Sequence, residues 1–198
     1  MSAPARSPAT YADLEAVPPH LVAEILFGSL VTHPRPMPRH SAAGYNLGLE
    51  LGSPFQRGRG GPGGWIFLPE PELHLGPHVL VPDVAGWRSE RLVSPATERA
   101  YIDIAPDWIC EVLSDSTEKY DKGEKRRMYA NDGVDHLWHV DPRVRSLEVF
   151  SRRGPDWLLT HTLFDDDDVC APPFDAVTFK FGLLWPFDLP TPSTSSTP

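Results

Sequence analysis

Residues 108–129 read WICEVLSDSTEKYDKGEKRRMY, and the start of this stretch sets an acidic side chain within an apolar run. Apolar residues on both alternating faces around Glu111 are typical of a strand that is buried on both sides, so we expect a strand over residues 107–114. A carboxylate in a buried strand is costly unless another group compensates its charge. Glu111 therefore requires either an ion-pair partner or a chemical role.

A helix is expected to follow this strand, over residues 122–130. Asp121 and Glu124 have the spacing of a capping box, in which Asp121 would cap the helix. Gly133 is expected to end the helix. The quoted stretch therefore predicts a buried strand followed by one helix.

This helix carries a lysine that we expect to point toward the sheet. Lys125 shares one helical face with Met128 and Tyr129, which are both residues that pack in protein interiors. A lysine on such a face lies within reach of the strand that contains Glu111. Lys125 is therefore the first candidate partner for Glu111.

A second carboxylate lies in the apolar run VLVPDVA, at residues 79–85. Pro82 directly precedes Asp83 and indicates an interruption of strand pairing, such as a bulge. Bulges often lie beside active sites. If this strand pairs with the strand of Glu111, the two carboxylates converge.

Two converging carboxylates in a partly dry site repel each other, and a divalent cation relieves that repulsion. Ligation by oxygen atoms alone favours Mg²⁺ or Mn²⁺ over zinc. Both ions suit phosphate chemistry, because they activate water and stabilise the negative charge that develops on phosphate oxygens.

Each of these acids also has a purely structural interpretation. Glu111 could form a buried salt bridge with Lys125 or Arg126, and Asp83 could be an ordinary turn aspartate. Taken singly, each acid is explained by structure alone. The combination of both acids with an inward lysine favours catalysis or metal binding.

The rest of the chain predicts an α/β fold with a mixed β-sheet in one domain, over residues 11–189. A hairpin is expected about Phe27–Gly28 and a helix over residues 40–51. We expect flexible residues 1–10 at the start and a disordered tail at the end, over residues 190–198. Loops are expected at residues 57–64 and 165–168, and strands at residues 65–75, 79–87, 136–141, 147–151 and 158–164.

The composition narrows the class of protein further. The net charge is −9 over 198 residues, which disfavours non-specific coating of nucleic acid but leaves room for a local basic groove. The two cysteines form no C-x-x-C pair, and a reducing cytoplasm is the simplest setting for them. No stretch approaches the length of a membrane span, so no membrane partner is expected.

Four strings of residues together resemble one family, the Uma-type restriction endonucleases of the PD-(D/E)XK phosphodiesterase superfamily. They are VPD at 81–83, APDWICEVLSDST at 105–117, DKGEKRRMY at 121–129 and GVDHLWHVDP at 133–142. The resemblance extends from about Tyr11 to Leu189, and includes AEILFGSLV at 23–31 and the pair Arg39-His40.

This resemblance implies a restriction-endonuclease-like fold, in which helices flank a mixed central sheet and which is often a homodimer. It also implies Mg²⁺-dependent hydrolysis of DNA phosphodiester bonds. Asp83 and Glu111 would hold the metal, and the Val112 carbonyl would be a further ligand. Lys125 would orient and activate the attacking water, and Glu24 would be a supporting acid near the metal.

The sequence departs from the superfamily at the catalytic lysine. That lysine normally lies two residues after the glutamate, where this chain has Leu113. Lys125, in the next helix, is the residue that matches the lysine of the family. Ser29 stands where the family more often has glutamate, so that position matters less in this chain.

Two functions from different classes follow from these observations. The first is a Mg²⁺-dependent deoxyribonuclease that uses Asp83, Glu111 and Lys125. The second is a catalytically silent protein of the nuclease fold that binds DNA or a protein partner, which the net charge favours. Hydrolysis of another phosphodiester is a third, weaker interpretation.

Overall fold

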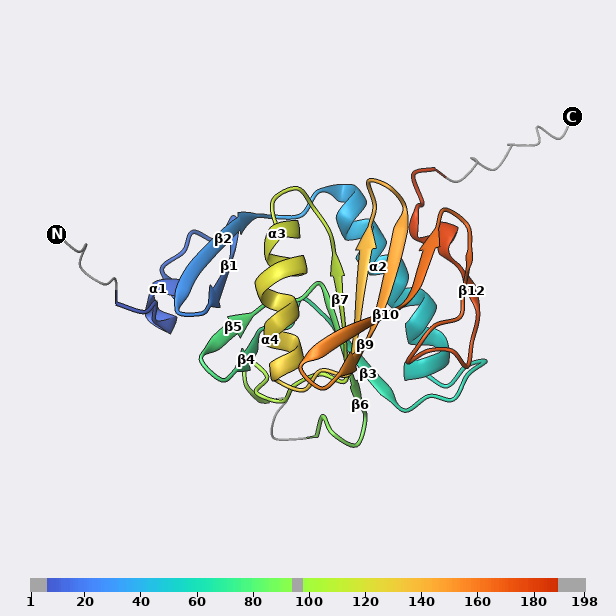
Figure 1. The fold of residues 1–198 in the computed structure, drawn as a ribbon, viewed down its shortest axis with the longest axis horizontal. Helices are drawn as coiled ribbons and strands as arrows, with labels where there is room; N and C mark the ends of the chain where they lie inside the picture. Colours follow the sequence, from blue (N-terminus) through green and yellow to red (C-terminus); the bar gives the residue numbers. More distant parts are fainter. Residues whose placement is uncertain (1–6, 94–97, 189–198) are drawn as a thin grey trace, which may run out of the picture.

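The computed structural model of the chain describes residues 7–93 and 98–188, and its centre is a six-stranded sheet (Figure 1). The strand order is β10-β9-β8-β7-β6-β3, in which β7 and β8 run parallel and the other neighbours run antiparallel. The expected mixed central sheet is therefore confirmed. Its strands are β3 (Trp65–Pro69), β6 (Val84–Arg88), β7 (Trp108–Val112), β8 (His136–Asp141), β9 (Ser146–Arg153) and β10 (Asp156–Phe164).

Strand β7 is the buried strand expected from the sequence, and its two faces contact different parts of the fold. Trp108 and Val112 belong to a hydrophobic cluster that includes residues of the helix α2 (Pro38–Leu51). Ile109 belongs to a second cluster, which includes residues of the helix α4 (Arg126–Asn131). Side chains of the central sheet therefore pack against a helix on each face.

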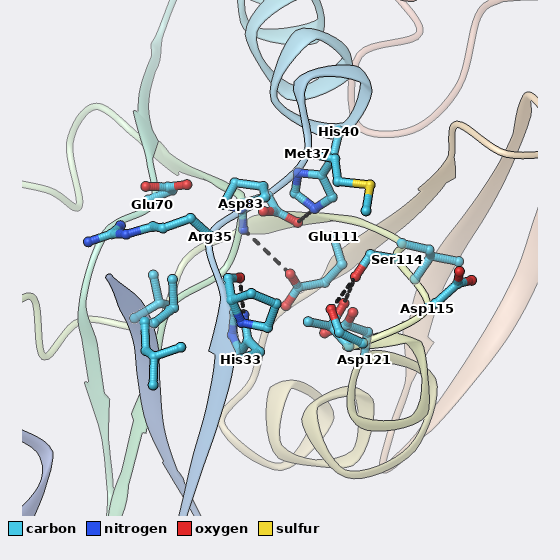
Figure 2. A pocket seen from close by; sticks show the side chains of 18 of the residues that line it. His33, Arg35, Met37, His40, Glu70, Asp83, Glu111, Ser114, Asp115 and Asp121 are labelled. Carbon is cyan, nitrogen blue, oxygen red and sulfur yellow. Dashed lines mark hydrogen bonds and ion pairs between the residues drawn. The ribbon is translucent and has the colours of Figure 1, made fainter. Parts of the chain in front are cut away.

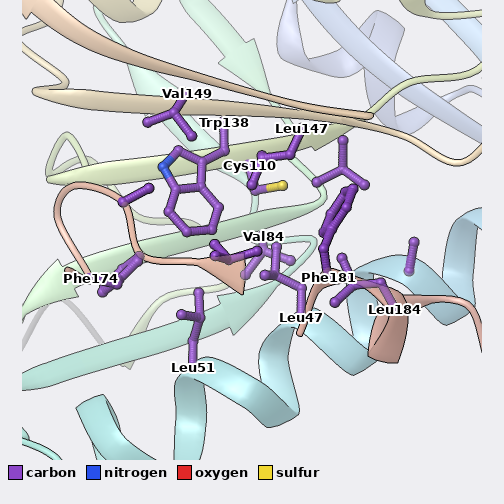
Figure 3. Packing of buried hydrophobic residues seen from close by; sticks show 14 of the residues in the cluster. Leu47, Leu51, Val84, Cys110, Trp138, Leu147, Val149, Phe174, Phe181 and Leu184 are labelled. Carbon is purple, nitrogen blue, oxygen red and sulfur yellow. The ribbon is translucent and has the colours of Figure 1, made fainter. Parts of the chain in front are cut away.

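The cluster beneath α2 is filled by large apolar side chains (Figure 3). It extends from α2 across β6, β7, β8 and β9 to the 3₁₀ helix η4 (Phe181–Leu184). Dense packing of this kind fixes the position of α2 against the sheet. The residues labelled in Figure 3 are Leu47, Leu51, Val84, Cys110, Trp138, Leu147, Val149, Phe174, Phe181 and Leu184.

A second sheet, of four strands in the order β2-β1-β5-β4, contains the hairpin expected about Phe27–Gly28. The two hairpins of this sheet meet where β1 pairs with β5, with Ile25 opposite Val79. The strands are β1 (Leu21–Leu26), β2 (Ser29–Pro34), β4 (Leu73–Leu75) and β5 (His78–Leu80).

Two strands expected from the sequence are each divided between the two sheets. The segment 65–75 forms β3 and β4, and the segment 79–87 forms β5 and β6. β3 pairs with β6 in the central sheet, while β4 pairs with β5 in the other sheet. The interruption expected at Pro82 is therefore confirmed, whereas the break between β3 and β4 was not expected.

The breaks have a local cause in the backbone. Pro71 and Pro82 lie in the two breaks and have no N–H group to donate to a strand neighbour. Glu70 has a φ of +44°, and its N–H donates to the Asp83 carbonyl at 3.0 Å. This hydrogen bond connects the two breaks to each other and places Asp83 at the junction of the two sheets.

The helix after β7 begins earlier than expected and contains Asp121 in its interior. It runs through α3 (Glu118–Tyr120), the π-helical turn η3 (Asp121–Lys125) and α4. Asp121 has a φ of −61° and a ψ of −48°, which are helical values, whereas a capping residue has extended ones. The expected capping role of Asp121 is therefore wrong. Gly133, with a φ of +87°, follows the helix as expected.

Other expectations hold in outline. The helix expected over residues 40–51 is α2, which continues into the π-helical turn η1 (Gly52–Gln56) and then an irregular loop. The acidic run 165–168 is exposed as expected, although Asp168 begins a short strand. That strand, β11 (Asp168–Val169), pairs with β12 (Phe179–Lys180), and neither was expected.

The ends of the chain lie largely outside the described residues. This applies to residues 1–6 of the segment expected to be flexible and to the whole tail expected at 190–198. Thr10 is described, and it caps the helix α1 (Tyr11–Glu15). That residues 11–189 form one domain stays a prediction. Within the described part of the chain, no helix combines the length and the apolar character needed to cross a membrane.

Candidate active site

Asp83 and Glu111 lie side by side at the ends of two paired strands (Figure 2). β6 pairs antiparallel with β7, with Val84 opposite Cys110, so the preceding Asp83 falls beside Glu111. The Asp83 N–H donates to Glu111 Oε2 at 3.4 Å, and the Val112 N–H donates to Asp83 Oδ2 at 2.7 Å. The backbone of each strand therefore holds the carboxylate of the other.

Lys125 reaches Glu111 from the π-helical turn η3. Its Nζ lies 2.8 Å from Glu111 Oε1, 3.2 Å from Glu24 Oε1 and 3.3 Å from Asp121 Oδ1. The lysine is buried, as are the three acids. π-helical turns are uncommon and occur frequently at functional sites. The inward direction expected for Lys125 is confirmed by these contacts.

Two further groups hold the buried acids. The Tyr129 hydroxyl donates to Glu111 Oε1 at 2.5 Å, from one turn after Lys125 on the same helix. Glu24 extends from β1, and its Oε1 accepts a hydrogen bond from the Val81 N–H at 2.8 Å. Val81 lies in the break after β5, so this bond replaces one that a continuous strand would have made.

His40, near the start of α2, contacts the exposed side of the pair. Its Nε2 lies 3.4 Å from Asp83 Oδ2 (Figure 2). Burial alone would lower the pKa of His40, but Asp83 and a hydrogen bond to the Val112 backbone outweigh it and raise that pKa. His40 therefore lies against both the carboxylate of Asp83 and the backbone of Val112.

Negative charge exceeds positive charge at this cluster. The cluster holds four carboxyl groups, of Glu24, Asp83, Glu111 and Asp121, and the ammonium group of Lys125 contacts three of them. Burial raises the pKa of Glu111 well above its usual value, and the neighbouring acids add to this effect. Burial would lower the pKa of Lys125, but Glu111 and Glu24 outweigh it and hold that pKa well above its usual value.

The cluster opens into a cavity of about 620 Å³. Asp83, Glu111 and Lys125 line it, and its opposite wall includes apolar residues of α1 and β1. A second cavity of about 330 Å³ lies along α2 and β3, and the two cavities share His40, Asp83 and Glu70. The acidic pair is therefore accessible to a ligand larger than water, with Asp83 at the boundary between two hollows.

The structure thus brings together all five residues that the sequence singled out: Glu24, Asp83, Glu111, Val112 and Lys125. Asp121, Tyr129 and His40 also belong to the cluster, although sequence reasoning gave them no role in it. The spacing of four between Asp121, Lys125 and Tyr129 was a usable signal, because it places three polar groups on one helical face.

No group of three or more His, Cys, Asp and Glu side chains in residues 7–93 and 98–188 has the arrangement of a complete metal site. The two acids at the ends of the paired strands, Asp83 and Glu111, both line the cavity, and the backbone of Val112 lies beside Asp83. Such a set leaves most positions around a cation to water or substrate. This arrangement is common for Mg²⁺ and unusual for a structural metal site.

Comparisons with known proteins agree with this geometry. A family profile named Uma2, described as "Putative restriction endonuclease", matches residues 8–179. Among solved structures, the chain is similar to a protein from Anabaena variabilis ATCC 29413 that is described as "a putative nuclease belonging to DUF820". The TM-score is 0.73 and the identity is 22%, over 90% of this chain and 98% of the other. This similarity shows a common fold. No curated protein matches the chain significantly.

Proposed function

The chain belongs to the Uma2 family, and on that premise we propose that it is an endonuclease that hydrolyses DNA phosphodiester bonds with Mg²⁺ or Mn²⁺. The observation that carries the proposal is the convergence of Asp83, Glu111 and Lys125 on one cavity. An acid pair beside a lysine is the set of groups that the PD-(D/E)XK superfamily uses. The chain also shares its fold with the protein described as "a putative nuclease", which supports the same class of function.

The donors at the cavity fit a hard divalent cation. Asp83 and Glu111 would supply two carboxylates, and the Val112 carbonyl would be a further, neutral ligand. The local excess of negative charge favours a cation of charge two, because Lys125 balances one acid of four. A bound Mg²⁺ or Mn²⁺ would supply an activated water and would stabilise charge on the phosphate oxygens.

Lys125 has two tasks in this proposal. Its ammonium group lowers the pKa of Glu111 against the opposing effect of burial, and it holds that carboxyl group in place through the contact at 2.8 Å. It also lines the cavity, where it orients the attacking water and offsets negative charge on the phosphate. Leu113 lines the same cavity at the position where the superfamily has its lysine. Lys125 therefore replaces a strand lysine by reaching the same carboxylate from the following helix.

The remaining polar groups position the acids. Tyr129 donates to Glu111 and fixes the direction of that carboxylate. His40 and the Val112 N–H hold Asp83 from two sides. Glu24 holds Lys125 from the hairpin side, at 3.2 Å, and is the supporting acid of the site. Because these contacts already fix the acidic side chains, those side chains need to move less when the reaction takes place.

One observation favours the silent alternative, in which the protein binds DNA or a protein partner without cutting. Lys125 and Tyr129 already satisfy Glu111 Oε1, as in a buried structural salt bridge. Asp83 argues for catalysis, because its side chain is 22% exposed at the cavity and no Lys or Arg of the described residues forms an ion pair with it.

Isothermal titration with Mn²⁺, combined with cleavage of plasmid and single-stranded DNA, tests the proposal. We expect Mn²⁺ binding and metal-dependent cleavage in the wild type, and loss of both in Asp83→Asn. Asp156→Asn is the matched control, because Asp156 is an exposed acid at the start of β10. Binding of Mn²⁺ that is unchanged by Asp83→Asn, with no cleavage by the wild type, would favour the silent alternative.

A further inference from the structure

The proposed DNA substrate creates an electrostatic problem at the cavity. A DNA strand brings one negative charge per phosphate to a site that already holds four carboxyl groups. The chain has 18 Lys and Arg residues, and among those in the described part of the chain four line the larger cavity: Arg35, Arg39, Lys125 and Arg143. Whether each of these four side chains is already paired with an acid decides where phosphates can bind.

Two of the four are fully engaged with acids. Lys125 contacts three buried carboxylates, as described above. Arg143 contacts Asp141 and Glu118 at 2.7 Å each, and also Asp115. These contacts tie the loop after β7 to the β8–β9 turn. Because acids already hold both side chains, neither cation can bind a further backbone phosphate, beyond the one at the acidic pair, without breaking the wall of the cavity.

Arg39 is engaged differently, because its partner lies at the far end of the chain. Its Nη1 lies 3.0 Å from Asp188 Oδ2, and its Nη2 lies 3.3 Å from Asp188 Oδ1. Arg145 Nη2 contacts the same Asp188 Oδ2 at 3.0 Å. Two guanidinium groups around one oxyanion form an arrangement that also fits a phosphate. Arg39 is 60% exposed, so exchange of one anion for another meets no packing barrier.

Arg35 has no carboxylate within ion-pair distance among the residues that the structure describes. Its Nη2 donates to the Pro19 carbonyl at 3.2 Å. Figure 2 shows Arg35 with Glu70 on one side of the Asp83–Glu111 pair, and Ser114 with Asp115 on the other side. Arg35 directly follows β2, and Arg39 lies in the first turn of α2. They therefore provide positive charge along one edge of the cavity.

We propose that Arg35 and Arg39 bind backbone phosphates of the DNA strand that enters the cavity, and that a phosphate displaces Asp188 from Arg39. This inference rests on the proposed nuclease function. It assigns DNA binding to exposed arginines and leaves hydrolysis to the buried cluster. Asp188 then acts as an internal competitor that lowers the affinity of the free protein for DNA.

Binding of fluorescent single- and double-stranded DNA to the full chain tests this assignment, with Ca²⁺ in place of Mg²⁺ to limit cleavage. Arg35→Gln and Arg39→Gln should each weaken binding roughly tenfold and reduce the salt slope by about one. Arg59→Gln, in the exposed loop 57–64, removes the same charge away from both cavities and should stay within about twofold of the wild type. Asp188→Asn should tighten binding several-fold, whereas the matched Asp156→Asn should not.

The outcomes separate the failure of this inference from the failure of the proposed function. If the wild type binds and cleaves DNA, but Arg35→Gln and Arg39→Gln bind like Arg59→Gln, the assignment is overturned and the nuclease proposal stands. If Asp188→Asn binds no tighter than Asp156→Asn, the displacement of Asp188 is overturned. If the wild type binds neither single-stranded nor double-stranded DNA, both proposals are overturned. Normal cleavage by Arg39→Gln at saturating DNA would support a role in binding alone.

Discussion

Lys125 Nζ lies 2.8 Å from Glu111 Oε1, although one residue comes from a π-helical turn and the other from the centre of the sheet. The contact joins the two elements of the stretch 108–129 across the face of the sheet. Removing one member of a buried pair leaves the other charge uncompensated, which costs far more than the net value of the pair. The ion pair between Lys125 and Glu111 therefore affects both the stability of the protein and the proposed chemistry.

Replacing Lys125 with Met should destabilise the protein and abolish cleavage. Methionine keeps most of the volume but leaves Glu111, Glu24 and Asp121 without their shared cation. We expect a loss of about 3 kcal/mol in the free energy of unfolding in urea. Lys125→Arg, which keeps the charge, should recover part of the stability.

The control for this change is Lys122→Met, because Lys122 is 40% exposed on the same helix and pairs with Glu118. Its stability should lie within about 1 kcal/mol of the wild type. Wild-type stability and cleavage in Lys125→Met would show that the buried contact has neither role.

Tyr129→Phe removes the hydroxyl that donates to Glu111 and leaves the buried ring in place. The carboxylate loses one donor in a dry environment, so unfolding in urea should become easier by about 1–3 kcal/mol. Tyr45→Phe is the matched change at a ring that is 69% exposed, and it should alter stability by less than about 0.5 kcal/mol. Equal effects of the two changes would mean that Tyr129 contributes packing alone.

Divalent cations should stabilise the folded protein. A ligand that binds the folded state alone raises the free energy of unfolding by about 2.7 kcal/mol when its concentration is a hundred times its Kd. Mn²⁺ or Mg²⁺ should therefore raise Tm in the wild type, and EDTA should reverse the effect. Asp83→Asn should lose most of this response. An unchanged wild-type Tm at millimolar Mn²⁺ would argue against a metal site.

Two glycine substitutions test the packing that positions the site. A Cβ at Gly86 in β6 would lie 2.9 Å from the Phe67 ring and 3.1 Å from Trp108, so Gly86→Ala should destabilise by about 1–3 kcal/mol. A Cβ at Gly48, within α2, would meet no atom within 4 Å, and Gly48→Ala should stabilise by up to about 1 kcal/mol. Chemical denaturation measures both, and a stabilising Gly86→Ala would contradict the packing of β6.

Much of the fold follows from local pattern. The run around Glu111 is apolar on both faces, which predicted the buried strand β7. The strand expected over residues 136–141 is β8, which has the same bounds. Lys125 was predicted to point inward because its helical face also carries Met128 and Tyr129, and all three are buried. These features depend on residues that are close together in the sequence, so the sequence alone was enough to predict them.

The features that were missed depend on contacts between distant segments. β5 breaks after Leu80, where the Val81 N–H bonds to Glu24 instead of a strand neighbour. Asp121 has the spacing of a capping residue, but a helix that starts at Glu118 and packs on the sheet turns its carboxylate to Lys125. Asp188 and Arg39 are far apart in the sequence, and only the fold brings them into an ion pair. A homodimer and a cytoplasmic setting stay predictions.

The proposed nuclease site depends above all on Glu111, which would hold the metal together with Asp83 and pair with Lys125. The most direct test is the single-turnover rate of plasmid cleavage with saturating Mn²⁺, for the wild type, Glu111→Gln and the control Asp156→Asn. Circular dichroism would establish that all three are folded. We predict that Glu111→Gln cleaves at least about a hundredfold more slowly than the wild type, with Asp156→Asn unchanged. Cleavage by folded Glu111→Gln at the wild-type rate would contradict a metal-dependent site at Asp83 and Glu111.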